Sequence, residues 1–156
     1  VITVVDSHGL EVSKEAEMAP YAAEIAKLAG LYASARTALI TVVVGEAYGS
    51  VFPVMGAKSL GADLVLARED AKIGVMNAAS AVAFLWNDKI GGNVTRADLE
   101  KEWDETVGTP AVAAMAGEVD DVILDAELRQ RLCAAVMMLR SKSKASPARR
   151  HANLPL

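Results

Sequence analysis

Four short apolar runs, rich in β-branched residues, recur along the first half of the chain. They cover residues 1–5, 39–44, 63–67 and 73–75. Runs of this kind, in which apolar residues follow one another without polar alternation, are typical of strands that are covered on both faces. A helical periodicity of apolar residues at 20–35 separates the first run from the second. Strands that alternate with helices predict an α/β fold.

The second half of the chain continues this alternation. Asp98 lies three residues after Thr95, which predicts a helix start, and Pro110 predicts the first turn of another helix. Residues 119–124 are expected to form a short strand. Strands this short, joined through single helices, fit a coiled β-β-α spiral and also a doubly wound sheet. Apolar periodicity alone does not decide between these two folds. Further helices are expected at 78–86 and from Leu128 onward, and the second of them has Leu132, Val136 and Leu139 on its buried stripe.

The composition limits what the core and the partners can be. Aromatic residues make up 4% of the chain and apolar residues 53%, so the core must consist of small and aliphatic side chains. We expect Cys133 to be a buried thiol and the methionines to fill the core. A net charge of −4 argues against nucleic-acid binding, and no stretch reaches the length of a membrane span. We therefore expect a soluble, cytoplasmic protein. Because residues 1–5 already form a strand, we expect a fragment of a longer chain.

The segment most informative about function is residues 45–58, Gly-Glu-Ala-Tyr-Gly-Ser-Val-Phe-Pro-Val-Met-Gly-Ala-Lys. Its pattern predicts a buried strand, a turn of small residues at Gly49, and a helix with Pro53 in its first turn. The first N–H groups of a helix have no partner within the helix and can bind an anion or a developing oxyanion. Strand–turn–helix units of this kind also serve purely structural roles.

Residues 45–58, with Gly61-Ala62-Asp63 after them, resemble the signature of the carboxyltransferase subunits of biotin-dependent acyl-CoA carboxylases and decarboxylases. This family includes the β subunits of propionyl-CoA and acetyl-CoA carboxylase and the α subunit of methylmalonyl-CoA decarboxylase. Further matches follow in order along nearly the whole chain, at Val5-Asp6, Ala26-Lys27-Leu28, Val75-Met76, Val119-Asp120-Asp121-Val122-Ile123 and the terminal His151-Ala152-Asn153-Leu154-Pro155-Leu156. The resemblance implies a crotonase-like, ClpP-like β-β-α spiral, with residues 1–156 as the C-terminal carboxyltransferase domain and a basic tail at 140–156.

The resemblance also implies the chemistry. A carboxyl group would pass between biotin, held on a carrier protein, and the α-carbon of a coenzyme A thioester. The backbone amides of Ser50 and Val51 would form the biotin-side oxyanion hole, Gly49 would give the turn clearance, and Phe52 and Pro53 would shape the acyl or biotin pocket. The implied partners are an N-terminal carboxyltransferase domain, biotin carboxylase and biotin carrier subunits, and further copies of the chain in a homo-oligomer.

Four residues depart from the family pattern, and three other functions stay open. Ser50 and Val51 replace a Gly-Ala pair, Pro53 stands where the family often has Asp, and His8, a possible general base, replaces a Pro. The chain could belong to a sodium-pump-type acyl-CoA decarboxylase, which runs the transfer in reverse, or be a non-catalytic assembly domain. A Clp-like serine protease would need a base beside Ser50, and the sequence after Ser50 offers no histidine before His151.

Overall fold

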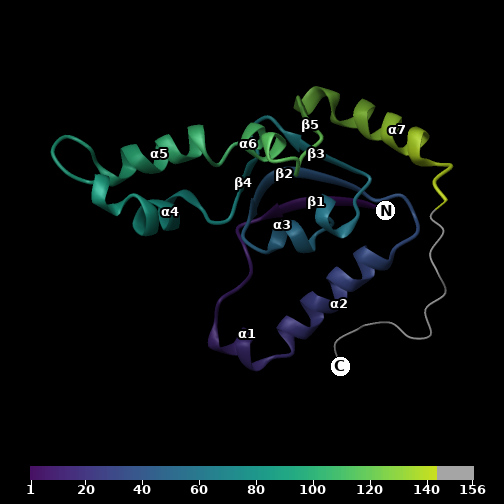
Figure 1. Cartoon of the computed structure of the whole chain (residues 1–156), viewed down its shortest axis with the longest axis horizontal. Helices are drawn as coiled ribbons and strands as arrows, with labels where there is room; N and C mark the ends of the chain where they lie inside the picture. The colour runs from purple at the N-terminus through teal and green to yellow at the C-terminus, as the bar shows by residue number, and fades with distance from the viewer. Residues whose placement is uncertain (144–156) are drawn as a thin grey trace.

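The computed structural model describes residues 1–143, and Figure 1 shows a parallel sheet at its centre. The sheet has five strands, in the spatial order β1-β2-β3-β5, with β4 paired to β2. Every strand pair is parallel. The predicted α/β architecture is therefore confirmed, and the strands are β1 (Ile2–Ser7), β2 (Ile40–Tyr48), β3 (Leu64–Arg68), β4 (Lys72–Gly74) and β5 (Asp121–Ile123).

Helices connect the strands, and most of them begin where the sequence predicts. Thr95 and Asp98 form a reciprocal capping box at the start of α5, and Thr109 caps α6 with Pro110 in its first turn. A short helix capped by Ser13, α1, was not predicted. The helices are α1 (Lys14–Met18), α2 (Tyr21–Ser34), α3 (Val51–Val54), α4 (Ala78–Leu85), α5 (Arg96–Thr106), α6 (Pro110–Met115) and α7 (Leu128–Leu139), with 3-10 turns at Lys58–Leu60, Asn87–Lys89 and Asp125–Glu127.

The core lies on both faces of the sheet, and a different set of helices covers each face. On one face, Val5, Val43 and Val65 pack with residues of α3 and α6. On the other face, Val42, Leu66 and Ile123 pack against Leu128 and Leu132 of α7. Figure 1 shows α7 on one side of the sheet and α2 and α3 on the opposite side. As predicted, aliphatic side chains make up most of this core.

One prediction about β1 is wrong. Its apolar run predicted cover on both faces, yet Ile2 and Val4 are 46% and 58% exposed. Val4 is in register with Val42, which is completely buried, so the two residues share a face of the sheet. Because α7 packs over Val42 and its neighbours toward β5, the edge strand β1 stays bare on that face.

Predictions for the helical part need further correction. Cys133 is exposed rather than buried, and Val136, placed on the buried stripe of α7, is 45% exposed. Met115 and the α7 methionines are also exposed instead of filling the core. The exposed side chains of α7 lie on outward faces because this helix buries only the stripe that meets the sheet. No helix among residues 1–143 is long and apolar enough to cross a membrane.

The helices α4 and α5 form a hairpin that projects from one end of the sheet (Figure 1). Trp86 and Trp103 pack edge to face within it, with ring centroids 5.0 Å apart and an interplanar angle of 73°. The ammonium group of Lys89 lies 3.6 Å from the centroid of the Trp86 ring. This hairpin brings Trp103 back toward the end of the sheet.

Candidate functional site

The predicted turn lies where β2 passes into α3. Gly49 has a φ of +62°, a left-handed conformation that favours glycine, and its N–H donates to the carbonyl of Gly74 in β4 over 2.9 Å. The helix then begins at Val51. The turn is thus held by the neighbouring strand β4, as well as by its own sequence.

The turn leaves backbone donors without acceptors. Within residues 1–143, no acceptor receives a hydrogen bond from the N–H of Ser50, Val51 or Phe52. The carbonyl groups of Ser50 and Val51 accept from Val54 and Met55, so the helical turn itself is formed. The side chains of Val51 and Phe52 are buried, at 6% and 4% exposure, and fix the backbone in this position. The predicted donors at Ser50 and Val51 are therefore available, and the N–H of Phe52 joins them.

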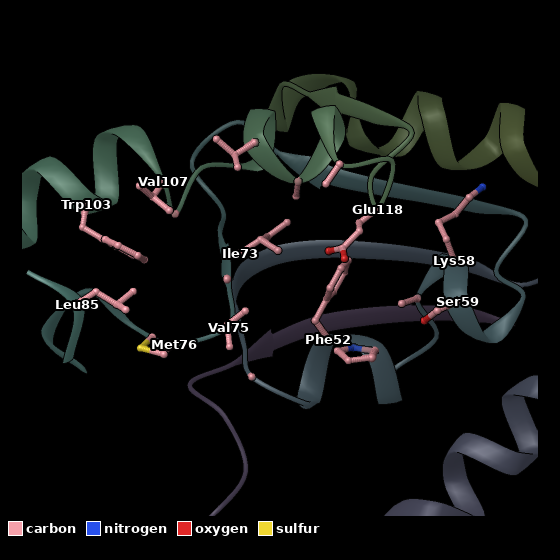
Figure 2. A pocket seen from close by; sticks show the side chains of 18 residues that line it. Phe52, Lys58, Ser59, Ile73, Val75, Met76, Leu85, Trp103, Val107 and Glu118 are labelled. Atoms are coloured by element: carbon pink, nitrogen blue, oxygen red, sulfur yellow. The ribbon is translucent and has the colours of Figure 1, made fainter. Parts of the chain in front are cut away.

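An apolar cavity of about 540 Å³ lies beside this turn (Figure 2). Three of the predicted site residues, Gly49, Phe52 and Pro53, line it, whereas Ser50 and Val51 do not. The sequence did not predict its other walls, because they come from segments far from the turn. These walls are formed by Ala57, Lys58, Ser59, Ile73, Gly74, Val75, Met76, Leu85, Trp103, Val107, Gly108, Val112, Ala113, Ala116 and Glu118.

The wall opposite the turn is fixed to β4 by two contacts. The N–H of Ile73 donates to the carbonyl of Gly108 over 3.1 Å. The ammonium group of Lys72 lies 3.4 Å from the carboxylate of Asp104 and also contacts the carbonyl of that residue. Since Asp104 follows Trp103 in α5, these contacts place the Trp103 ring at the cavity.

A bulge in β2 directs the strand toward the turn. Val5 pairs with Val43 and Ser7 with Ala47, so three residues of β2 lie opposite Asp6 alone. The Asp6 carboxylate accepts the N–H of Glu46 over 2.9 Å. A Cβ at Gly45 would lie 2.2 Å from the same carboxylate oxygen. Gly45 is therefore required for Asp6 to close the bulge.

The Lys58 side chain forms an ion pair. Its ammonium group lies 2.9 Å from the Asp120 carboxylate and 3.3 Å from the carbonyl of Asp63. The Asp120 carboxylate also accepts the N–H of Val65 over 2.7 Å. Lys58 lines the cavity, but its ammonium group points away from the apolar walls (Figure 2) and pairs with the Asp120 carboxylate.

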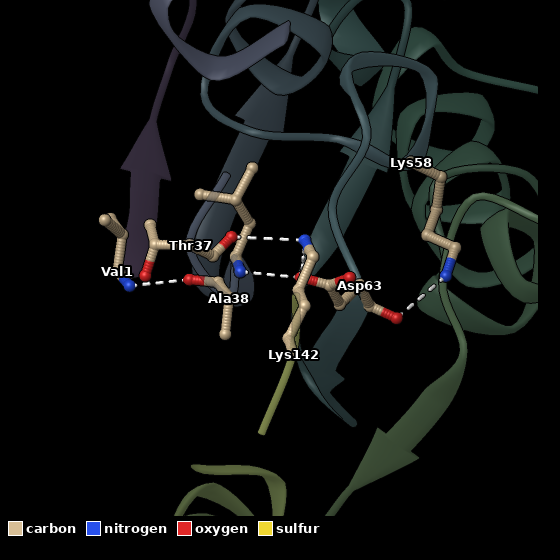
Figure 3. Close-up of polar contacts among 7 residues, drawn as sticks. Val1, Thr37, Ala38, Lys58, Asp63 and Lys142 are labelled. Carbon is tan, nitrogen blue, oxygen red and sulfur yellow. Dashed lines mark hydrogen bonds and ion pairs between the residues drawn. The ribbon is translucent and has the colours of Figure 1, made fainter. Parts of the chain in front are cut away.

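Asp63 caps a backbone N–H at the end of the strands opposite the turn (Figure 3). Its carboxylate accepts the N–H of Leu39 over 2.8 Å and lies 2.7 Å from the ammonium group of Lys142, which also donates to the carbonyl of Thr37. Burial raises the pKa of Asp63, but the hydrogen bonds from Leu39 and Lys142 and the charges of Lys142 and Lys58 outweigh it, so the pKa lies below its ordinary value.

The polar groups around the end of β2 do not form a nucleophilic site. Burial, with the nearby charges of Glu46 and Asp104, raises the pKa of Tyr48 to about 12, so its phenol keeps its proton at neutral pH. His8, predicted as a possible base, contacts the Glu46 carboxylate through Nδ1 and is the one histidine among residues 1–143. Among residues 1–143, no basic side chain forms a hydrogen bond with the Ser50 hydroxyl. His151 lies outside the described residues. The basic tail likewise lies outside them from residue 144 onward.

The part of the chain that the structure describes holds no group of three or more His, Cys, Asp or Glu side chains placed to bind a metal ion. Carboxylates here serve backbone N–H groups or lysines, as at Asp6, Asp63 and Asp120. The arrangement offers backbone donors, an apolar cavity and one further carboxylate, that of Glu118.

Comparison with known proteins fits this geometry. The family model described as carboxyl transferase domain matches residues 1–154. The propionyl-CoA carboxylase beta chain of Saccharopolyspora erythraea is 38% identical over the full length of this chain, which covers 30% of that protein. The carboxyltransferase subunit of propionyl-CoA carboxylase from Haloferax mediterranei is 40% identical over 84% of this chain, which covers 26% of that protein. The chain therefore spans less than a third of the length of these relatives.

A solved structure with the same fold is transcarboxylase 12S, described as a hexamer assembly with methylmalonyl-coenzyme A and methylmalonic acid bound. It matches 99% of this chain and 30% of its own, with a TM-score of 0.88 and 34% identity. The geranyl-CoA carboxylase beta subunit of Pseudomonas aeruginosa shares the fold with a TM-score of 0.72 at 19% identity. The expected crotonase-like fold and the expected relationship are both confirmed.

Proposed function

The chain belongs to the carboxyl transferase domain family, and from this membership we propose that it supplies part of an active site for carboxyl transfer between biotin and the α-carbon of an acyl-CoA. We assign it to the C-terminal carboxyltransferase domain of a longer subunit. The observation that carries the proposal is the turn at residues 49–51, where strand β2 ends beside an apolar cavity and the first N–H groups of α3 have no acceptor within residues 1–143.

The residues present fit a bound biotin group. When bound, biotin supplies the carrier for the carboxyl group through its ureido ring. The N–H groups of Ser50 and Val51 donate hydrogen bonds to an oxygen that gains negative charge, and such fixed donors lower the barrier without reorganising. Gly49 lets the backbone approach, while Phe52 and Pro53 form the apolar wall beside the turn.

Two of the departures from the family pattern, at Ser50 and Val51, leave the backbone donors in place, whereas Pro53 lines the cavity. Substitution affects the side chains of Ser50 and Val51, whereas the proposed chemistry uses their backbone. The Ser50 side chain is exposed and that of Val51 is buried in the core, and neither lines the cavity. The larger side chains at positions 50 and 51 therefore do not narrow this cavity.

The proposal includes partners and a location. The cavity opens at Val75 and Leu85, which are 81% and 50% exposed. An apolar rim of this kind fits a covering surface, and we assign this role to the N-terminal carboxyltransferase domain within a homo-oligomer. Biotin carboxylase and biotin carrier subunits would deliver the carboxyl group, and we place the assembly in the cytoplasm. The same residues would serve the reverse direction in a decarboxylase.

The direct test is carboxyl transfer by the complete subunit that carries this chain. It would be incubated with carboxylated biotin carrier and a panel of acyl-CoA thioesters, and transfer would be followed as labelled carboxyl in the thioester fraction. We expect turnover with at least one thioester of the panel. Absence of turnover with every thioester, by a folded and assembled subunit, would refute the proposal.

A further inference from the structure

The Glu118 side chain is an acidic, solvent-exposed group that lines the cavity beside the proposed turn. Gly117, with a φ of +80°, ends the α6 region, and the N–H of Glu118 donates to the carbonyl of Ala113 over 3.0 Å. Val119, the next residue, is 4% exposed and anchors the backbone in the core. Asp120 then bonds Val65 through its backbone N–H and through its carboxylate. The backbone on both sides of Glu118 is therefore fixed.

Glu118 is directed into the cavity, where Figure 2 shows its carboxylate above the Phe52 ring. Within residues 1–143, the Glu118 carboxylate has no hydrogen bond or ion pair. Lys58, the other charged residue of the lining, is engaged by Asp120 and by the carbonyl of Asp63. The third polar residue of the lining is Ser59, at the same end as Lys58 (Figure 2).

The chemistry of this arrangement selects among ligands. An ionised carboxylate only accepts hydrogen bonds, so it favours a ligand that brings a donor. Its negative charge, placed at an apolar cavity, disfavours a phosphate or carboxylate at the same position. The remaining walls are apolar and suit an uncharged ligand body. The preferred ligand is therefore neutral, largely apolar and equipped with an N–H group.

We propose that Glu118 is a recognition residue of this cavity, whose carboxylate accepts an N–H from a neutral ureido or amide group of the ligand. This inference rests on the proposed function, because two ligands of that reaction carry such groups. The ureido ring of biotin has two N–H donors, and the pantetheine arm of coenzyme A has amide N–H donors. Both offer the same chemistry to Glu118, and binding measurements distinguish them.

The first experiment measures binding to the complete subunit that carries this chain, by isothermal titration calorimetry. The ligands are biotinamide and pantetheine, which are neutral and represent the two sources. The variants are Glu118→Leu, Glu118→Gln, which keeps an acceptor oxygen, and the control Glu102→Leu, which removes an exposed carboxylate outside the cavity. Circular dichroism checks that each variant keeps its helices.

We expect Glu118→Leu to weaken the binding of one of the two ligands roughly tenfold, as for loss of a hydrogen bond to a charged group. Glu118→Gln should show a smaller loss, and Glu102→Leu none. The ligand that loses affinity identifies the source of the N–H group. Unchanged binding of both ligands by Glu118→Leu would overturn the inference, as would failure of the unmodified complete subunit to bind either ligand.

A second comparison needs no variant and so holds even if Glu118→Leu does not fold. The ureido fragment 2-imidazolidinone has two N–H groups, and its N,N′-dimethyl derivative has none. If the site binds a ureido group, the unmodified complete subunit should bind 2-imidazolidinone but not its N,N′-dimethyl derivative. If the site binds an amide, N-methylation of the pantetheine amides should abolish the binding of pantetheine. Equal affinity within both pairs contradicts a role for the N–H group. Carboxyl transfer by the complete subunit is measured separately. If transfer occurs but the N–H group has no effect on binding, this inference fails while the proposed function stands.

Discussion

Replacing Asp63 by Asn tests the polar network that joins β2, β3 and the end of α7. The Asp63 and Lys142 side chains are 20% and 17% exposed, so their 2.7 Å contact is largely shielded from water. Asn keeps an oxygen for the N–H of Leu39 but leaves the Lys142 ammonium group without its counter-charge. Hydrogen bonds to charged groups contribute about 1.5–3 kcal/mol, and we expect Asp63→Asn to lower the free energy of unfolding by about 1–2 kcal/mol. Asp88→Asn, at an exposed carboxylate, is the matched control.

The effect of Asp63→Asn on the free energy of unfolding should depend on pH in a defined direction. The pKa of Asp63 is lower in the folded chain than its ordinary value of 3.8, so its contribution is present above that value and is lost as the pH falls through the folded pKa. Urea denaturation followed by circular dichroism at pH 7 and at pH 3 measures the difference between the native chain and Asp63→Asn. We expect the difference to shrink at the lower pH. A difference that is absent at pH 7, or that grows in acid, would refute the assigned network.

Two further predictions concern the approach of β2 to the turn. Gly45→Ala places a Cβ 2.2 Å from an Asp6 oxygen, so it should displace Asp6 and lower the midpoint of chemical denaturation. Adding Asp6→Ala should recover part of this loss, and fully additive effects of the two substitutions on the free energy of unfolding would contradict the contact. The Tyr48 phenol should titrate near pH 12 instead of pH 10, and Tyr48→Phe should remove the corresponding late rise in phenolate absorbance. If all tyrosines of the folded chain titrate near pH 10, the burial of Tyr48 beside Glu46 and Asp104 is disproved.

Much of the fold could be predicted from the sequence because local rules fix it. The apolar runs predict the strands, and Thr95 with Asp98 and Thr109 with Pro110 predict helix starts that the structure confirms. The cover of each surface could not be predicted in this way. A run such as residues 1–5 reports that its side chains are apolar, but the position of α7 decides which of them it buries, and it leaves Ile2 and Val4 exposed.

The candidate site also combines parts that local sequence predicts with parts that depend on contacts between distant segments. The turn at Gly49 was predictable, since a strand, a glycine and a helix start lie within a few residues of one another. Trp103 was not, because it reaches the cavity through the pairing of β4 with β2 and the contact of Ile73 with Gly108, and Glu118 was not, because the contacts between Asp120 and Val65 place it there. No local pattern encodes contacts between segments this far apart.

The most direct test of the account is the rate of carboxyl transfer after deletion of one backbone donor. Val51→Pro removes the N–H at the first position of α3, while the control Val51→Ala shortens the same side chain and keeps the N–H. Because Ser50 has αR dihedrals, which a following proline disfavours, folding of Val51→Pro is checked first by circular dichroism. In the complete subunit with saturating acyl-CoA, we expect Val51→Pro to lower kcat by on the order of 10²–10³ and Val51→Ala to retain most of it. Equal rates for the two variants, both shown to be folded and assembled, would contradict the assignment of an oxyanion hole to this turn.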